Sequence, residues 1–238
     1  MKKMINILLA AVLILAYGCQ KEEILTNNTN KIVIVTAEAG VHSFGVTTDA
    51  GWSVTMDEAA KEWCQFEGPT SGSGIGAFTV SFSENVFDGV RRGLRRQAVI
   101  KVITDDQFTS TTIYLRQSGV TPKLEFKNQV EKVSYKSTET TLAINTNLSI
   151  YEADKIVYTI SGGEWITNKV FNPNGTSILF QYPINESMES SRKTTVKIAY
   201  VDAWGETFGD SIEFTQEAKP TPPELFEDIN ADENDNEF

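Results

Sequence analysis

The stretch FTVSFS, residues 78–83, alternates apolar and small polar side chains with a period of two. Because successive side chains of a β-strand point to opposite faces, this alternation predicts a strand whose two phenylalanines and valine are buried on one face. The stretch ILFQY, residues 178–182, repeats the pattern in the second half of the chain. The alternation therefore predicts β-structure with one buried face in two separate parts of the sequence.

Four pairs of identical residues recur at similar offsets, which indicates an internal repeat. They are Trp63 and Trp165, 102 positions apart, Asn85 and Asn185, 100 apart, Arg96 and Arg192, 96 apart, and Gln117 and Gln216, 99 apart. These offsets predict two copies of one unit, residues 32–119 and 122–217, joined by a very short linker. Each copy has the size of a small domain.

Each copy also contains a pair of apolar-periodic runs separated by turn residues. Residues 98–117 predict two strands around Asp105-Asp106, and residues 195–216 predict two strands around residues 202–205. Residues 56–62 form the one helix-like segment. Six or seven short strands per copy are typical of an all-β protein, and we expect two tandem immunoglobulin-like β-sandwich domains.

The first copy contains the stretches AGWSV (50–54), EW (62–63), GPTSGSGIGAFTVSFSEN (68–85), RRQAVIKV (95–102) and IYLRQSG (113–119). In these stretches it resembles the BACON domain, a name that abbreviates Bacteroidetes-associated carbohydrate-binding, often N-terminal. Membership of this family implies a sandwich fold. Its suggested roles are glycan or mucin binding, and spacing of partner domains from the membrane.

The second copy is a divergent match to the same pattern. It keeps EWI (164–166), NGTSILFQYPIN (174–185), SRKTTVKI (191–198) and IEFTQE (212–217), but Leu148 stands where the first copy has Trp52. The two matches together cover residues 32–217, which is most of the chain after its first 31 residues.

The start of the chain predicts export and lipidation. Lys2 and Lys3 precede an apolar stretch over residues 5–16 that is too short to cross about 30 Å of hydrocarbon as a helix, as expected of a signal peptide over residues 1–19. The run LAYGC, residues 15–19, resembles a bacterial lipobox, which implies a diacylglyceryl thioether on Cys19. An ordinary secreted protein with an incidental cysteine is the alternative.

The residues after Cys19 predict the final address of the protein. The run QKEE, residues 20–23, resembles the short signal that sends lipoproteins of Bacteroidetes-type bacteria to the outer face of the outer membrane. A solvated charge run is the alternative. We expect an outer-membrane protein that faces the cell exterior, touches the membrane by its lipid anchor only, and has a flexible tether over residues 20–31.

Composition excludes several functional classes. Removing residues 1–19 takes away two lysines and no acid, so 19 basic residues remain against 32 acidic ones, a formal charge of −13. Nucleic acid is therefore excluded as a partner, since phosphate binding needs a cationic surface. His42 is the single histidine, which argues against a Cys/His hydrolase, and zinc-ligand spacing is absent. With Cys19 lipidated, Cys64 has no disulfide partner and is expected to be a small buried hydrophobe. We expect no enzyme activity, no metal and no cofactor.

Five residues are candidates for ligand binding. Trp204 lies at a predicted hairpin tip, where an exposed indole would stack on a sugar ring. Four arginines would bind sulfated or sialylated glycans by charge-assisted hydrogen bonds, or else belong to a solvated loop; they are Arg91, Arg92, Arg95 and Arg96. The repeated tryptophans are expected in the cores, and the repeated Asn, Arg and Gln residues are expected to fix loops and strand ends.

The last segment, residues 218–238, is rich in proline and acidic residues and poor in apolar ones. Its composition predicts a disordered acidic tail. Acidic and amide side chains alternate over residues 228–234 as in a calcium loop, but Glu233 stands where that loop needs glycine. No metal site is predicted there.

Two functional hypotheses follow for the whole chain. The first is a surface lipoprotein with tandem immunoglobulin-like domains that binds host or dietary glycans weakly, or serves adhesion. The alternative is a non-catalytic spacer, or a subunit of a surface assembly that contains another surface lipoprotein.

Overall fold

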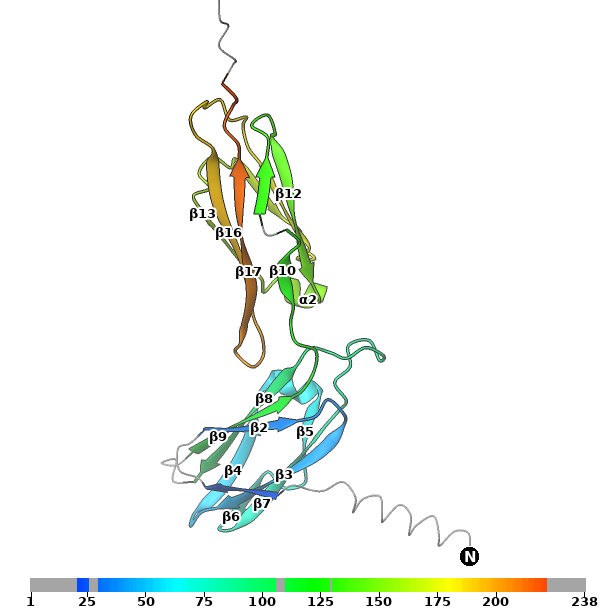
Figure 1. Cartoon of the computed structure of the whole chain (residues 1–238). Helices are drawn as coiled ribbons and strands as arrows, with labels where there is room; N and C mark the ends of the chain where they lie inside the picture. Colours follow the sequence, from blue (N-terminus) through cyan, green and yellow to red (C-terminus); the bar gives the residue numbers. More distant parts are fainter. Residues whose placement is uncertain (1–20, 26–29, 106–109, 129, 222–238) are drawn as a thin grey trace, which may run out of the picture. The chain divides into compact units, whose positions relative to one another are not determined.

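The computed structural model describes residues 21–25, 30–105, 110–128 and 130–221. The chain divides into two compact units. The first unit comprises residues 1–122 together with 201–208, and the second comprises residues 123–200 and 209–238. Both are built of β-sheets (Figure 1), so the prediction of an all-β protein with two sandwich domains is confirmed. The predicted signal peptide, residues 1–19, and residues 222–238 of the predicted tail lie outside the described residues.

The first unit packs a four-stranded sheet against a five-stranded sheet. The first sheet has, in spatial order, β1 (Lys21–Leu25), β3 (Gly40–Thr47), β7 (Gly76–Phe82) and β5 (Cys64–Glu67). The second sheet has β2 (Asn30–Val35), β9 (Ser110–Gln117), β8 (Arg96–Thr104), β4 (Gly51–Met56) and β6 (Ser71–Ser73). The pairs β1·β3 and β2·β9 are parallel, whereas the other ladders are antiparallel. The helix-like segment is a 3-10 helix, Glu58–Glu62.

The core of the first unit lies between its two sheets. Phe44 on β3 and Phe78 on β7 are fully buried and stack with ring centroids 5.0 Å apart. Trp52 on β4 is also buried. Trp63 is only half-buried and packs against the rim of the core. The alternation seen in residues 78–83 thus places the expected face inward, with Phe78, Val80 and Phe82 all buried.

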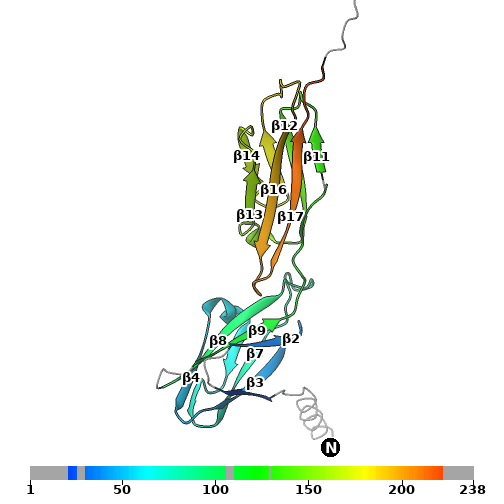
Figure 2. The same cartoon turned by 60° about the vertical axis from the view of Figure 1, so that its left-hand side comes forward.

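The second unit packs two four-stranded sheets together. One has β10 (Leu124–Phe126), β12 (Glu139–Thr146), β15 (Ser177–Gln181) and β14 (Asn168–Phe171). The other has β11 (Val130–Val133), β17 (Thr207–Gln216), β16 (Arg192–Val201) and β13 (Val157–Ser161), an order that can be followed in Figure 2. A single helical turn, α2 (Ile150–Ala153), lies between β12 and β13.

Trp165 closes the core of the second unit. Its ring stacks on Phe214 at 5.3 Å and meets Tyr182 edge-on at 5.2 Å. Ile178 and Phe180 on β15 are fully buried below it. The second unit therefore buries the residues that the periodicity predicted, with Trp165 itself half-buried.

Two predicted features differ from the structure. The flexible tether over residues 20–31 is wrong for Lys21–Leu25, which form β1 in parallel register with β3, and for Asn30 and Lys31, which begin β2. Pairing of the main chain with a sheet edge orders these residues. The units contain nine and eight strands in their described parts, more than the six or seven expected, because short edge strands carry little periodicity.

Candidate binding surfaces

Arg95 lies in a nearly closed polar site of the first unit. Its side chain is 10% exposed, its Nε donates to the carboxylate of Asp202, and its Nη2 donates to Glu206 Oε2. The guanidinium lies over the rings of Trp204 and Phe208, 4.5 and 5.1 Å from their centroids. Burial works to lower the pKa of Arg95, but the bonds to Glu206 and Asp202 outweigh it, so this pKa is raised. Arg95 is thus held as a cation by partners within the chain.

Trp204 is half-buried rather than exposed, so the prediction of an exposed indole is wrong. The Nε1 of Trp204 donates to the main-chain oxygen of Arg96 over 3.0 Å, and Arg116 Nη2 donates to the main-chain oxygen of Trp204 over 2.9 Å. The guanidinium carbons of Arg95 and Arg116 lie 4.5 and 5.4 Å from its ring centroid. Cation–π contacts with two arginines account for its partial burial. A ligand-binding role for Trp204 stays a prediction.

Arg91 and Arg92 are exposed and paired with acids. Arg91 Nε lies 2.7 Å from Asp88 Oδ2. Arg92 contacts Glu38 at 2.5 Å and Glu84 at 3.5 Å. The pKa of Asp88 is lowered to about 2 by hydrogen bonds from the main-chain N–H and the side chain of Arg91. The two arginines are therefore matched by acids at the same surface, and their glycan-binding role stays a prediction.

Arg96 belongs to a polar network at the end of the first sandwich. Its Nε donates to Gln117 Oε1 over 2.8 Å, its Nη2 donates to the main-chain oxygen of Ser83, and its guanidinium lies 4.3 Å from the centroid of Trp63. Gln117 is fully buried and donates through Nε2 to three main-chain oxygens, of Ala37, Glu38 and Ser83. The structure thus splits the predicted arginine cluster between separate partners.

Asn85 completes this network by closing the loop between β7 and β8. Its Nδ2 donates to the main-chain oxygens of Leu94 and Ser118 over 2.8 and 2.9 Å. Asn185 does the same in the second unit, with donations to Ser190 and Glu217 over 3.0 and 2.9 Å. The hypothesis that these repeated residues fix loops and strand ends is confirmed.

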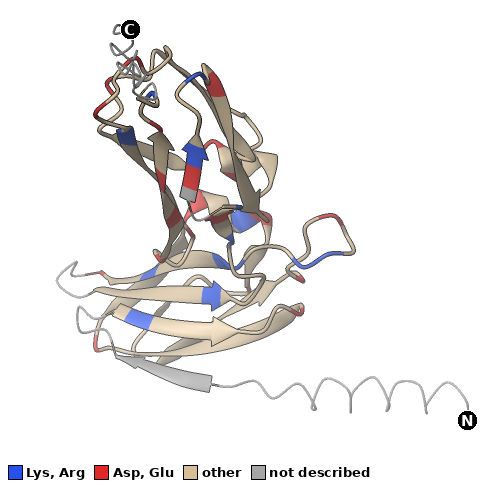
Figure 3. Ribbon diagram, turned by 45° about the horizontal axis from the view of Figure 1, so that its top comes forward, with Lys and Arg blue, Asp and Glu red and all other residues tan. Residues whose placement is uncertain are grey.

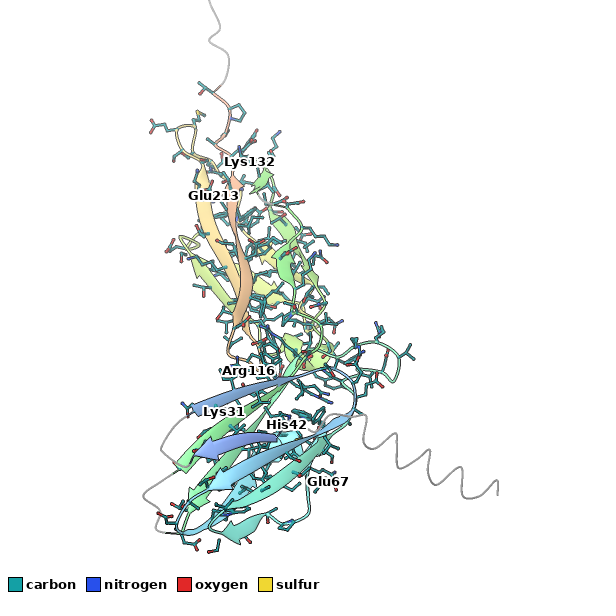
Figure 4. All side chains as sticks on the ribbon, turned by 60° about the horizontal axis from the view of Figure 1, so that its bottom comes forward. Lys31, His42, Glu67, Arg116, Lys132 and Glu213 are labelled. Carbon is teal, nitrogen blue, oxygen red and sulfur yellow. The ribbon has the colours of Figure 1, made fainter. Side chains whose placement is uncertain are left out.

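The second unit carries a shallow groove that the sequence analysis missed. It has a volume of about 360 Å³ and runs over β11, β17 and β16. Its lining residues are Lys132, Ser191, Lys193, Glu213, Thr215, Glu217 and Ala218. Lys132 and Glu213, labelled in Figure 4, come from neighbouring strands. The spacing of Glu213, Thr215 and Glu217 puts them on one face of β17 and its extension, which was a usable signal.

The groove is polar and balanced in charge. Lys193 Nζ donates to Glu213 Oε1 over 2.9 Å, and this bond lowers the pKa of Glu213. Two lysines, two glutamates and two hydroxyls therefore offer both donors and acceptors to a ligand. Basic and acidic residues are also interspersed over both units (Figure 3).

The single histidine and the free thiol of the first unit, which are its usual candidates for acid-base or nucleophilic chemistry, are both buried. His42 is 7% exposed, with its ring 4.6 Å from that of Phe44. Cys64 is fully buried, and burial raises the pKa of its thiol to about 12. Across the described ranges, no three His, Cys, Asp or Glu side chains are grouped to hold a metal ion.

The described part of the chain also contains no helix that is long and apolar enough to cross a bilayer.

Comparison with known proteins shows no family for this chain. No family model matches the chain, and no curated protein matches it. Among solved structures, it is similar to a Bacteroides ovatus GH5 xyloglucanase in complex with a heptasaccharide, with 19% identity and a TM-score of 0.30 over 37% of this chain and 17% of that one. It is also similar to domains EC1-3 of mouse clustered protocadherin PcdhgC3, with 12% identity and a TM-score of 0.32 over 80% and 66% of the two chains.

The tandem immunoglobulin domains of titin give a third similarity, with 12% identity and a TM-score of 0.28 over 85% of this chain and 97% of that one. The chain is an all-β protein of two sandwich units, and tandem immunoglobulin and cadherin domains are among the solved structures similar to it.

Proposed function

We propose that the chain is a lipid-anchored protein of the outer bacterial surface whose tandem sandwiches bind glycans weakly and so serve adhesion. The observation that carries this proposal is the polar groove over β11, β17 and β16. A sugar ligand must regain, from the protein, the hydrogen bonds that its hydroxyl groups lose on leaving water. The lysine, carboxylate and hydroxyl groups of the groove meet that need.

The charges of the groove favour a neutral glycan over a strongly anionic one. Lys132 and Lys193 are offset by Glu213 and Glu217 along the same lining. An open, shallow site with no aromatic residue in its lining provides few apolar contacts, so binding is expected to be weak. Several copies held on one cell surface would compensate by multivalency.

The proposed address depends on the sequence. Lipidation of Cys19 would attach the chain to the membrane, and the run at residues 20–23 would direct it to the exterior. The resemblance of both repeats to the BACON domain supports a role at glycans on the cell surface.

A glycan array measured with the Cys19→Ala chain tests the binding step. The triple variant Lys132→Ala, Lys193→Ala, Glu213→Gln should lose the signal, because it removes both donors and an acceptor from the groove. The matched control is Lys169→Ala on β14, an exposed lysine of the other sheet in the same unit, which should bind normally. Trp204→Ala and the Arg91→Ala, Arg92→Ala pair test the candidates predicted from sequence. Glycan binding that the triple variant leaves intact would remove the groove from the proposal.

Membrane attachment is tested separately in the producing cell. Cys19→Ala should release the protein into the soluble fraction, and replacing residues 21–23 by alanine should abolish cleavage by protease added to intact cells while keeping the anchor. If protease added to intact cells does not cleave the wild-type chain, the surface address is contradicted.

A second function, as a spacer or subunit of a surface assembly, is favoured by one observation. Arg95 and Trp204 engage each other and neighbouring groups of the chain, as structural residues do. A stoichiometric protein partner recovered from surface membranes, together with an empty glycan array, would establish this function instead.

A further inference from the structure

The loop between β7 and β8 forms a rigid turn of its own. Phe87 N–H donates to the main-chain oxygen of Arg91 over 2.8 Å. Asp88 Oδ1 accepts from the N–H groups of Arg91 and Val90, over 2.9 and 3.3 Å, and Gly89 has the left-handed φ of 80° that glycine tolerates best. Val86 and Arg92 close the turn with an antiparallel bridge. We call residues 86–92 the apolar-tip loop.

Two apolar side chains are exposed at this turn. Val90 is 88% exposed and Phe87 is 52% exposed, with the guanidinium of Arg91 5.8 Å from the centroid of the Phe87 ring. In Figure 1 the loop, coloured between cyan and green, extends away from the two sheets of its unit. Burying these side chains in an apolar medium would be favourable, since their hydrophobic surface is left in water by the fold.

The fold does not require this loop to be so long. Asn85 and Arg96 frame it in the first unit, and Asn185 and Arg192 frame its counterpart in the second. The first frame is 11 positions long and the second is 7, so the first unit has four more residues at the same structural position. Those additional residues include the exposed tip, which the shared hydrogen-bond network does not use.

The apolar-tip loop lies at the end of the sandwich that the start of β1 faces. Lys21, the first residue of β1, pairs with Ser43, and because β1 and β3 are parallel, the start of β1 faces the Gly40 end of β3. Gly40 pairs with Phe82, the last residue of β7, after which the loop follows. Cys19 is two positions before Lys21, so its main chain is within about 7 Å of that residue. A lipid on Cys19 would bring the membrane to this end of the unit.

We propose that the apolar-tip loop inserts Phe87 and Val90 into the headgroup region of the membrane that holds the lipid anchor. This inference rests on the proposed lipidation of Cys19. Two side chains bind a bilayer too weakly on their own, but a lipid on the same unit keeps the loop at a high local concentration near the surface. Insertion would give the first unit a second membrane contact and restrict its orientation on the cell.

The charges beside the loop indicate which lipids it needs. Arg91 and Arg92 are offset by Asp88, Glu38 and Glu84. Insertion should therefore depend on apolar contact and should change little when anionic lipid replaces zwitterionic lipid. This separates the proposal from binding by a basic patch.

The test uses the full lipidated chain reconstituted in phosphatidylcholine vesicles. Val90→Cys is labelled with an environment-sensitive fluorophore, and the buried thiol of Cys64 will not compete for the label. The matched control is Ile75→Cys, which is 85% exposed at the opposite end of the same unit, beside the Val46–Gly76 pair. The Val90 label should shift to the blue and be quenched about twofold or more strongly than the Ile75 label by nitroxide-bearing lipids.

The outcomes distinguish this inference from the proposed function. A lipidated chain, verified by its mass, whose Val90 label stays as exposed to water as the Ile75 label would overturn the inference alone. A chain without lipid on Cys19 would overturn both. Phe87→Ser should reduce the blue shift at position 90. Protection of the Val90 label that arises in intact cells but not in protein-free vesicles would refute lipid insertion in favour of a protein partner.

Discussion

Gln117 and Gln216 occupy the same position in the two sandwiches and make the same hydrogen bonds. Each side chain is fully buried, and each Nε2 lies within reach of three main-chain oxygens, of Ala37, Glu38 and Ser83 in the first unit and of Tyr135, Ser137 and Pro183 in the second. Each Oε1 accepts from the arginine of the repeat, Arg96 or Arg192. Each buried amide nitrogen thus donates to main-chain oxygens of residues that lie outside the strands.

Gln117→Ala should destabilise the first unit by about 2–4 kcal/mol, because it removes a fully buried amide that donates to three main-chain oxygens and opens a cavity. Gln216→Ala should do the same to the second unit. Urea unfolding followed by circular dichroism measures both effects. Gln65→Ala and Gln181→Ala, at exposed positions of the same two units, should cost under about 0.5 kcal/mol. Equal stability of the buried and exposed variants would contradict a structural role for the repeated glutamine.

Arg95→Ala should be among the most damaging single changes in the first unit. Asp202 is 2% exposed, and removing its partner leaves a buried carboxylate unpaired, at a cost of about 3–5 kcal/mol. Arg95→Lys keeps the charge but cannot serve both Asp202 and Glu206 in a fixed fork, so it should be intermediate. Thermal unfolding measures the series. Lys219→Ala, which breaks the exposed pair with Glu186, is the comparison and should change stability little. An Arg95→Ala chain as stable as Lys219→Ala would show that the site tolerates an unpaired acid.

Much of the fold was predictable because buried sheet faces impose a period of two. Phe78, Val80 and Phe82 alternate with polar residues, and the structure buries all three. The repeated Asn85 and Asn185 also revealed the two units, since the same carbonyl groups must be satisfied in each. Strand β1 was not predictable, because its pairing with β3 is a long-range main-chain contact that the local sequence pattern does not show.

The environment of the candidate site residues was less predictable than the fold. Trp204 follows a strand and precedes a glycine, which is the local pattern of an exposed turn. Its partners Arg95, Arg96 and Arg116 are about 90 to 110 positions away in the chain, so local pattern carries no trace of them. The adjacent arginines likewise have separate partners, because residues on a bent loop diverge after a few positions.

Cys64 should be unreactive in the folded protein. Burial, with a further contribution from Asp57 and an opposing one from Arg96, raises the pKa of its thiol to about 12, so the reactive thiolate is scarce at pH 8. Ellman's reagent should label it slowly in buffer and rapidly in denaturant. The unfolded thiol ionises at a lower pH than the folded one, so stability should fall as pH rises from about 9 toward 12. Cys64→Ala should remove this part of the alkaline loss, and rapid labelling in buffer would contradict burial.

Gly76→Ala should destabilise the first unit, because the new methyl group would clash with the side chain of Trp52. A Cβ at Gly76 would lie 2.6 Å from the Cζ2 atom of Trp52, and one at Gly72 would lie 2.5 Å from the same atom. The indole is 3% exposed in the core and cannot move away without displacing its neighbours. The expected cost is about 1–3 kcal/mol in urea unfolding.

A double-mutant cycle isolates this contact. Trp52→Phe removes the atoms that meet the new methyl group, together with an indole N–H that has no hydrogen-bond partner within the described part of the chain. The Gly76→Ala substitution should therefore cost less in the Trp52→Phe background than in the wild type. Ser73→Ala, at an exposed position of β6, controls for a general effect of substitution in this turn. The same cost of Gly76→Ala in both backgrounds would mean that backbone change, rather than contact with Trp52, makes glycine necessary at the start of β7.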